Sequence, residues 1–283
     1  MTVIEPARGL SPDQLDAIAG LEARVVAHDG GRLKLEWGRL RRRAGELAED
    51  VLAWEDETLV GFVGLYGPGA PQIELAGMVD PGHRRRGIGG ELLTAALTLS
   101  AAAGAREPLL IVPRESVGGR ALADRHRATF DHSEHALVLD GEPTDGPSDP
   151  RLQMRPAERR DVSAIMALMS SGFGFAPPDT AERLVEEGVR SYVFEREERV
   201  IATLRVNIED DTAGVYGFAV DPEWRGRGIG RDALRRTCRE LRERGVRTVG
   251  LEVAVENDRA LHLYTSLGFQ PVITEDYWAI SAG

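Results

Sequence analysis

Residues 220–230 read VDPEWRGRGIG, and residues 79–89 read VDPGHRRRGIG. The two stretches lie 141 positions apart and share eight of eleven residues, which chance does not explain. We therefore interpret the 283-residue chain as two copies of one domain. The segment 140–150, rich in Pro, Gly and Asp, is the expected linker between them. The expected domains are residues 1–145 and residues 146–283.

Composition and charge argue against several classes of protein. The chain has 35 basic and 46 acidic residues, a net charge of −11, which argues against a general nucleic-acid or anionic-membrane binder. The single cysteine, Cys238, cannot form an internal disulfide. No stretch approaches the roughly 18 apolar residues of a membrane span, and the N-terminus lacks the apolar core of a signal peptide. We expect a cytoplasmic protein without a nucleic-acid or membrane partner.

Apolar periodicity predicts strands that alternate with helices, which indicates an α/β fold. In the second copy the predicted strands are 152–155, 191–195, 200–206, 214–220 and 249–255, the helices are 161–169, 229–244 and a third ending at Leu267, and a hairpin at 270–280 closes the domain. In the first copy the predicted strands are 51–55, 59–66, 73–79, 109–112 and 136–139, and the helices are 88–102 and 119–126.

The glycine-rich turn between strand and helix has the composition of a phosphate site. Glycine permits positive φ and close approach of the backbone to a ligand, and a helix start supplies unpaired N–H groups. Arginines in both turns are suited to hold phosphate oxygens. The Gly-Lys-Ser/Thr of a Walker loop is absent, and a dinucleotide turn would follow the first strand. The pattern predicts a pyrophosphate seat in each copy, the alternative being a tight turn alone.

The turn resembles the acyl-coenzyme A pyrophosphate loop of the GNAT superfamily of N-acetyltransferases. Residues 257–269, NDRALHLYTSLGF, are similar to that superfamily's Asn-x-x-Ala-x-x-x-Tyr-x-x-x-Gly-Phe segment. Two such domains in tandem also look like mycothiol synthase, in which the C-terminal domain carries catalysis. The resemblance implies two domains, each a mixed central sheet flanked by helices, and acetyl-CoA as co-substrate without a metal. The cofactor-binding residues expected from the turn and the resemblance are Val220, Arg225, Gly226, Arg227, Gly228, Ile229, Gly230 and Asn257 in the second copy, and Val79, Arg84, Arg86, Gly87 and Gly89 in the first.

Tyr264 is the candidate general acid. A phenol with a pKa of about 10 can protonate a stronger base and regain its proton through solvent. The resemblance assigns this role to the tyrosine of the 257–269 segment. The alternative is a core aromatic, because apolar residues share its helical face.

Glu252 is the candidate general base. It lies twelve residues before Tyr264, and its strand neighbours Leu251 and Val253 point to the opposite face. The ribosomal-protein alanine N-acetyltransferase branch resembles this segment, with a glutamate base at the same spacing. A half-buried strand carboxylate would have a raised pKa, as a base near neutral pH requires. The alternatives are a solvated strand residue, a base acting through water, or one of Glu209, Asp210 and Asp211.

The first copy departs from the pattern. Counting back from Phe130 places Arg125 where Tyr264 stands, and the strand 109–112 has no carboxylate. We expect the first copy to be a structural or cofactor-holding domain without catalytic activity.

The expected function is acetyl transfer from acetyl-CoA to a primary amine of a small molecule or peptide, in the second half. The acceptor is expected to contact residues 170–178 and 274–278. The alternatives are a mycothiol-synthase-like acetyltransferase and a non-catalytic acyl-CoA sensor. The sequence leaves the acceptor and the oligomeric state open.

Overall fold

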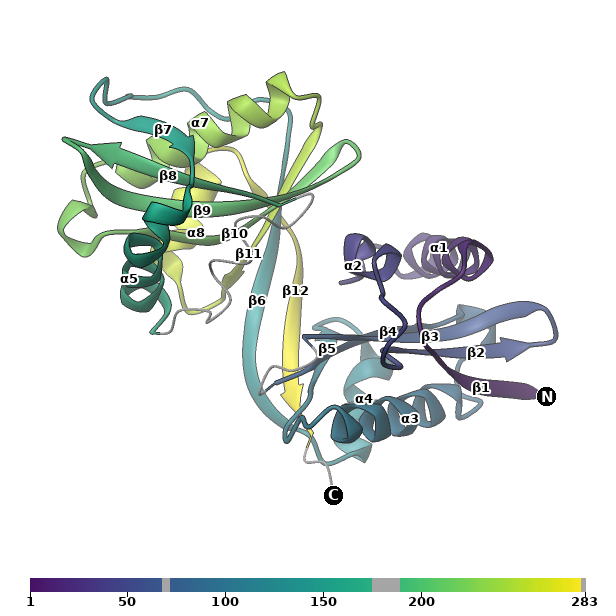
Figure 1. The fold of residues 1–283 in the computed structure, drawn as a ribbon. Coiled ribbons are helices and arrows are strands. Elements are labelled where there is room, and N and C mark those ends of the chain that lie inside the picture. Colours follow the sequence, from purple (N-terminus) through teal and green to yellow (C-terminus); the bar gives the residue numbers. More distant parts are fainter. Residues whose placement is uncertain (68–71, 175–188, 281–283) are drawn as a thin grey trace. The chain divides into compact units, whose positions relative to one another are not determined.

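The computed structural model describes residues 1–67, 72–174 and 189–280 and divides into two compact units (Figure 1). Unit 1 comprises residues 1–134 and 273–283, and unit 2 comprises residues 135–272. These ranges differ from the halves of the repeat because two long strands, β6 and β12, each continue from one unit into the other. No helix of the described part is long and apolar enough to cross a membrane.

Unit 1 is a mixed sheet with helices on both faces. Its strands lie in the order β1-β2-β3-β4-β5-β12, and β4 and β5 are parallel while the other described pairings are antiparallel. Apolar residues of α3 and α4 pack on one face of the sheet, and those of α1 and α2 pack on the other. The elements are β1 (Thr2–Ala7), α1 (Pro12–Asp29), α2 (Trp37–Arg41), β2 (Asp50–Glu55), β3 (Thr58–Tyr66), β4 (Glu74–Val79), a 3₁₀ helix (Pro81–His83), α3 (Ile88–Ala102), β5 (Leu109–Pro113), α4 (Val117–Arg125), β6 (Thr129–Asp140) and β12 (Gln270–Ala279).

Unit 2 repeats this plan. Its strands lie in the order β6-β11-β10-β9-β8-β7, and β10 and β11 form the parallel pair. Helices α7 and α8 pack on one face, where they share one apolar core with the sheet. The elements are β7 (Gln153–Pro156), a 3₁₀ helix (Arg159–Asp161), α5 (Val162–Phe173), β8 (Val189–Arg196), β9 (Arg199–Glu209), β10 (Thr212–Val220), a 3₁₀ helix (Pro222–Trp224), α7 (Ile229–Glu243), β11 (Thr248–Ala254) and α8 (Asp258–Ser266). The expected mixed sheet flanked by helices is confirmed in both units.

The hairpin expected at 270–280 is wrong. These residues form one strand, β12, whose C-terminal part belongs to unit 1 and pairs with β5, with Tyr277 opposite Ile111. Alternation of apolar residues predicts a strand but does not identify its partner. Residues 274–278, which were expected to contact the acceptor, belong to this strand, and Tyr277 is only 1% exposed. Of the other expected acceptor segment, residues 175–178 lie outside the described part.

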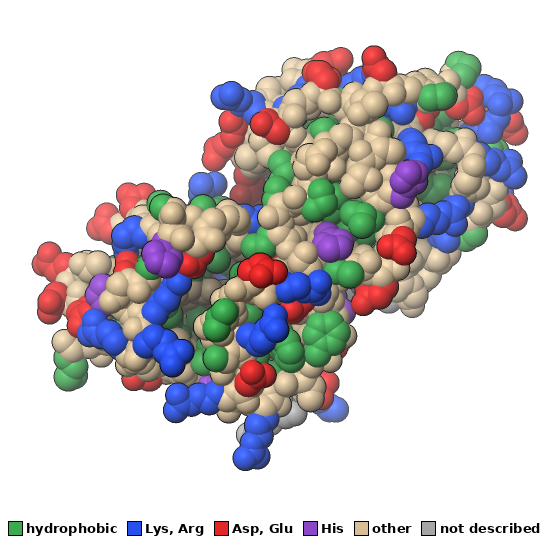
Figure 2. All heavy atoms as spheres, turned by 180° about the vertical axis from the view of Figure 1, so that it is seen from behind, with side chains coloured by type: hydrophobic (Ala, Val, Ile, Leu, Met, Phe, Trp, Pro, Cys, Tyr) green, Lys and Arg blue, Asp and Glu red, His purple; other side chains and the backbone are tan. Residues whose placement is uncertain are grey.

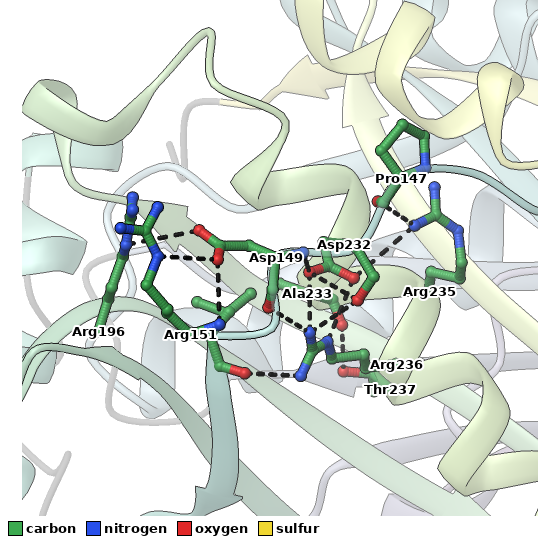
Figure 3. Close-up of polar contacts among 11 residues, drawn as sticks. Pro147, Asp149, Arg151, Arg196, Asp232, Ala233, Arg235, Arg236 and Thr237 are labelled. Atoms are coloured by element: carbon green, nitrogen blue, oxygen red, sulfur yellow. Dashed lines mark hydrogen bonds and ion pairs between the residues drawn. The ribbon is translucent and has the colours of Figure 1, made fainter.

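Acidic and basic side chains are interspersed on the face shown in Figure 2. A similar mixture occurs inside unit 2, where the joint at 140–150 lies against α7 (Figure 3). Arg235 donates hydrogen bonds to two backbone carbonyls of this segment, at 3.0 Å each. Arg236 donates to the Asp149 carbonyl at 2.8 Å, and Asp232 accepts from the Asp149 N–H at 2.9 Å. The segment is therefore a fixed part of unit 2 rather than a free linker.

Asp232 and Arg235 are 3% and 4% exposed and lie 3.7 Å apart, so removal of one charge leaves the other buried. We predict that Asp232→Ala lowers the free energy of unfolding by about 3–5 kcal/mol, measured by urea denaturation. Asp232→Asn should cost less, because an amide oxygen can still accept from the Asp149 N–H. The exposed Arg239→Ala, on the same helix, is the control and should change stability by about 0.5 kcal/mol or less. A loss below about 1 kcal/mol in Asp232→Ala would contradict this account.

Candidate active site

The glycine turn of unit 2 links the end of β10 to the start of α7. Gly226 and Gly228 have φ of 76° and 83°, in the left-handed region that glycine adopts without strain. Gly228 directly precedes the first residue of α7, so unpaired helix N–H groups begin here. Ile229 is 3% exposed and packs in the core, so it anchors the turn and offers only its backbone to a ligand.

A groove of about 260 Å³ lies over this turn. It is lined by Gly226, Gly228, Gly230, Arg231, Arg259, His262 and Leu263. The three glycines were predicted from the sequence. The three basic residues were not predicted, although Arg259 and His262, one turn apart at the start of α8, gave a signal that could have found them.

The expected arginines of the turn lie outside the lining of the groove. The Arg225 Nε donates to the Val220 carbonyl at 2.8 Å, which ties the turn to the end of β10. Arg227 lies over the ring of Trp224, with 5.2 Å between the guanidinium carbon and the ring centroid. Asn257 caps α8 by accepting a hydrogen bond from the Ala260 N–H at 3.1 Å. Val220, Arg225 and Asn257 thus have structural contacts beside any contact to a ligand.

Strand β10 carries a bulge next to this turn. The antiparallel register between β9 and β10 shifts between Tyr216 and Ala219, and Gly217 has a φ of 57°. A bulge leaves one residue of the strand outside the ladder, so its backbone groups are available to other partners. The parallel pairing of β10 with β11 is described as far as Val215 opposite Leu251. The bulge was not predicted, although a glycine inside a strand often marks one.

Tyr264 lies on the core side of unit 2. It is 9% exposed, and its ring packs against Phe269 with 6.1 Å between centroids. Burial raises the pKa of its phenol to about 12. Within the described residues its hydroxyl makes no hydrogen bond. The phenol therefore stays protonated over the physiological pH range.

Glu252 lies on the opposite face of the sheet. Leu251 and Val253 are buried in the core, and Glu252 between them is half-buried on the other side, as the alternation predicts. Tyr216 follows Val215, which pairs with Leu251, so it lies on the same face as Glu252. The structure therefore assigns the two expected catalytic residues to different faces of one sheet.

The corresponding turn of unit 1 differs in its side chains. Arg85, with a φ of 62°, takes the place of Gly226. Arg84 donates to the Asp29 carboxylate through both Nη atoms, at 2.8 and 2.6 Å, and Arg86 donates likewise to Glu55 at 3.0 and 2.6 Å. The Arg84 guanidinium holds the pKa of the Asp29 carboxyl below its usual range. Both arginines expected to bind phosphate are thus paired with carboxylates.

The expected glycines of unit 1, Gly87 and Gly89, have the same place at the start of a helix as their counterparts in unit 2. Gly87 has a φ of 91° and precedes α3, as Gly228 precedes α7. A Cβ on Gly87 would lie 3.7 Å from the Glu91 carboxylate, and one on Gly89 would lie 3.7 Å from the Val79 side chain. The register between β3 and β4 is unbroken, so this unit has no bulge in the strand that leads to its turn.

The residue of unit 1 that corresponds to Tyr264 is Ala123, so the prediction of Arg125 at this position is wrong. Helices α4 and α8 begin and end 141 positions apart, and the left-handed residue after each is Arg127 or Gly268, again 141 apart. Counting from Phe130 failed because the offset of 141 positions aligns the ends of the two helices but does not align Phe130 with Phe269. Ala123 is fully buried and has no hydroxyl that could donate a proton.

The residues of the two units match a known family. Residues 21–123 and 163–269 match the model of the acetyltransferase (GNAT) family. The chain belongs to this family. It is an N-acetyltransferase with two GNAT domains in tandem, and enzymes of the family use acetyl-CoA. No group of three or more His, Cys, Asp or Glu side chains that could hold a metal occurs in the described residues.

The chain is similar to curated mycothiol acetyltransferases over nearly its whole length. It is 32% identical to that of Kineococcus radiotolerans, with 95% of this chain and 94% of the relative covered. It is 29% identical to that of Thermomonospora curvata, with 92% of each covered. Among solved structures, a GCN5-related N-acetyltransferase from Sphaerobacter thermophilus has a TM-score of 0.80 at 19% identity, covering 99% of this chain and 96% of its own. A tandem GNAT protein of the clavulanic acid biosynthesis pathway has a TM-score of 0.72 at 20% identity, covering 100% and 99%. These two structures share the fold.

The open groove predicts that acetyl-CoA binding needs a bare backbone at Gly228. A side chain there would meet no atom within 4 Å, so Gly228→Leu would place its bulk in the groove. We predict at least about tenfold weaker binding of acetyl-CoA, measured by calorimetry. Gly245→Leu is the matched control, because Gly245 also has positive φ, 89°, and open space around it, but follows the far end of α7. Equal affinity in the two variants would refute a role for the turn.

Proposed function

We propose that unit 2 transfers the acetyl group of acetyl-CoA to an amine of a polar small molecule, and that unit 1 contributes no chemistry. One observation carries the proposal: three features needed for the reaction occur together in unit 2. These are the open glycine turn, the bulge at Gly217 and the buried phenol of Tyr264. Unit 1 has Arg85, an unbroken strand and Ala123 at these points.

The cofactor's pyrophosphate would lie on the backbone N–H groups at Gly228, Ile229 and Gly230. These groups begin helix α7, where the helix dipole favours an anion. Arg225 and Arg227 are exposed beside the turn, and no carboxylate of the described residues pairs with them. In unit 1 the corresponding arginines, Arg84 and Arg86, would have to break their ion pairs with Asp29 and Glu55 before they could bind a phosphate.

The acetyl thioester would lie at the bulge of β10. Beyond Val215 no parallel pairing with β11 is described, and the bulge releases a backbone N–H from the ladder near Gly217. Such a donor can stabilise the oxyanion that forms when the amine attacks the carbonyl. Because Tyr264 and Glu252 lie on different faces of the sheet, the leaving thiolate would depart toward one and the amine would arrive from the other.

Tyr264 would assist departure of the thiolate mainly as a hydrogen-bond donor. A thiol has a pKa of about 8.5, well below the pKa of about 12 for this phenol, so complete proton transfer from tyrosine to thiolate is uphill. The proton balance closes because the amine loses one proton on acylation and the thiolate gains one. Glu252 would accept the proton from the amine, directly or through a water molecule.

A polar acceptor fits the face of the sheet that carries Glu252. Arg205 pairs with Tyr216 across β9 and β10 and lies over its ring, 5.7 Å from the centroid. On the next row Asn207 donates to Glu209 at 2.8 Å, while its buried Oδ1 has no partner in the described part. A hydroxyl or ammonium of the acceptor could donate to this oxygen. The similarity to mycothiol acetyltransferases supports an acceptor related to mycothiol.

Tyr264→Phe keeps the ring and its packing but removes the donor. We predict that kcat falls by about 10²–10⁴ while the Kd for acetyl-CoA is unchanged. In the unaltered enzyme, loss of activity from ionisation of this phenol should be half complete near pH 12 rather than near pH 10, because burial raises its pKa to about 12. Tyr192→Phe is the matched control, because Tyr192 is a buried tyrosine of unit 2 that donates to Glu240 away from the groove. A near-normal kcat for Tyr264→Phe would leave Tyr264 as a core aromatic only.

Glu252→Gln removes the proposed base without a change of shape. We predict the greatest loss of kcat at pH values below the pKa of the acceptor amine, and partial recovery as the pH rises, because a free amine needs no base. The pH profile of kcat on an active acceptor measures this. Glu209→Gln is the parallel variant. If it showed this profile and Glu252→Gln did not, the base would be Glu209.

A further inference from the structure

The groove of unit 2 is lined by basic side chains beside the glycine turn. Its wall from α7 and α8 holds Arg231, Arg259 and His262, and the described residues that line it include no carboxylate. This contrasts with the net charge of −11 for the whole chain. We call these three residues the basic wall.

Arg231 is held in place by a neighbouring helix. It lies in the first turn of α7, half-buried, and its Nε donates to the Ser266 Oγ at 2.8 Å. The Ser266 hydroxyl in turn donates to the Leu263 carbonyl at 2.7 Å. No ion pair engages the guanidinium within the described residues. Its terminal nitrogens are therefore presented to the groove without a competing carboxylate.

Arg259 and His262 reach the groove from the first turns of α8. They are three positions apart, so they lie on the same side of the helix. A terminal nitrogen of Arg259 lies 3.8 Å from the point where a Cβ on Gly226 would stand, which places the guanidinium beside the turn. Both side chains are exposed, and neither has an ion pair with another described residue.

The basic wall is not needed to build the turn. In unit 1 the residues 141 positions earlier are Gly90, Gly118 and Ala121, yet Gly87 keeps the same left-handed conformation before its helix. Unit 1 also places the Glu91 carboxylate beside that glycine. Two arginines and a histidine that the fold does not require, beside a groove without a carboxylate among its described lining residues, point to an anionic ligand group.

Coenzyme A has one more phosphate than the diphosphate proposed for the turn. This 3′-phosphate, on the adenosine ribose, is a monoester that carries a charge of about −1.5 to −2 near pH 7. We propose that Arg231, Arg259 and His262 bind the 3′-phosphate and select coenzyme A over its dephosphorylated form. The proposal rests on the proposed function of the turn. Charge-assisted hydrogen bonds from guanidinium to phosphate would provide the selectivity.

The test is calorimetry on the full chain with coenzyme A and with 3′-dephospho-coenzyme A. We expect the unaltered protein to bind coenzyme A at least about tenfold more tightly. The double variant Arg259→Ala, His262→Ala changes exposed side chains only, so its fold should be intact. It should lose most of this preference, because coenzyme A binds more weakly while the affinity for the dephosphorylated form stays the same. Arg239→Ala, exposed on α7 and outside the lining, should keep the full preference.

Three outcomes would overturn the assignment, and they are distinguishable. Equal binding of the two ligands by the unaltered protein would show that the 3′-phosphate is not recognised, while the coenzyme site itself stands. Equal weakening of both ligands in the double variant would show that the basic wall holds the diphosphate instead. Failure of the unaltered protein to bind either ligand would reject the proposed function together with the subsite.

Discussion

The structure of each unit depends on a backbone constraint at one glycine. Gly228 and Gly87 take left-handed φ values at the junction of a strand with a helix, where a side chain would be strained. This conformation lets the helix start directly after a tight turn, with its unpaired N–H groups facing outward. The buried residues that follow, Ile229 and Ile88, fix the helix to the core. The same junction therefore packs the helix on the core and provides the unpaired N–H groups on which the proposed phosphate site depends.

The two units keep this junction while the side chains around it differ. Unit 1 keeps the left-handed glycine, but Asp29 and Glu55 neutralise its arginines and Ala123 stands at the position of the phenol. Pairing of exposed arginine and carboxylate contributes little to stability, so these ion pairs are not required for the fold. Their effect is electrostatic, because they reduce the positive potential that an incoming phosphate would meet.

The sequence predicted local elements well and long-range partners poorly. Helix α3 occurs at the predicted 88–102, because a glycine start and apolar spacing are local signals. Strand β12 was recognised as extended, but its pairing with β5 depends on residues far away in the chain. The contact between Arg235 and the joint segment is of the same kind, since an arginine on a helix is ordinarily solvated. The groove's glycines were found from their motif, whereas Arg259 and His262 matched an ordinary exposed helix face.

Because the sheet separates Tyr264 from Glu252, the proposed reaction needs an interruption in the sheet, and the bulge of β10 at Gly217 is such an interruption. A regular parallel pair of strands would close the sheet between the two faces, because every backbone group on both strands would be paired. The shift at Gly217 breaks this regularity on β10 at the point where the pairing described with β11 has ended. A thioester held there would meet a donor on the buried side and a base on the polar side. In the proposed reaction, the burial that raises the pKa of Tyr264 would also keep water from the leaving group, so both effects would arise from the core of unit 2.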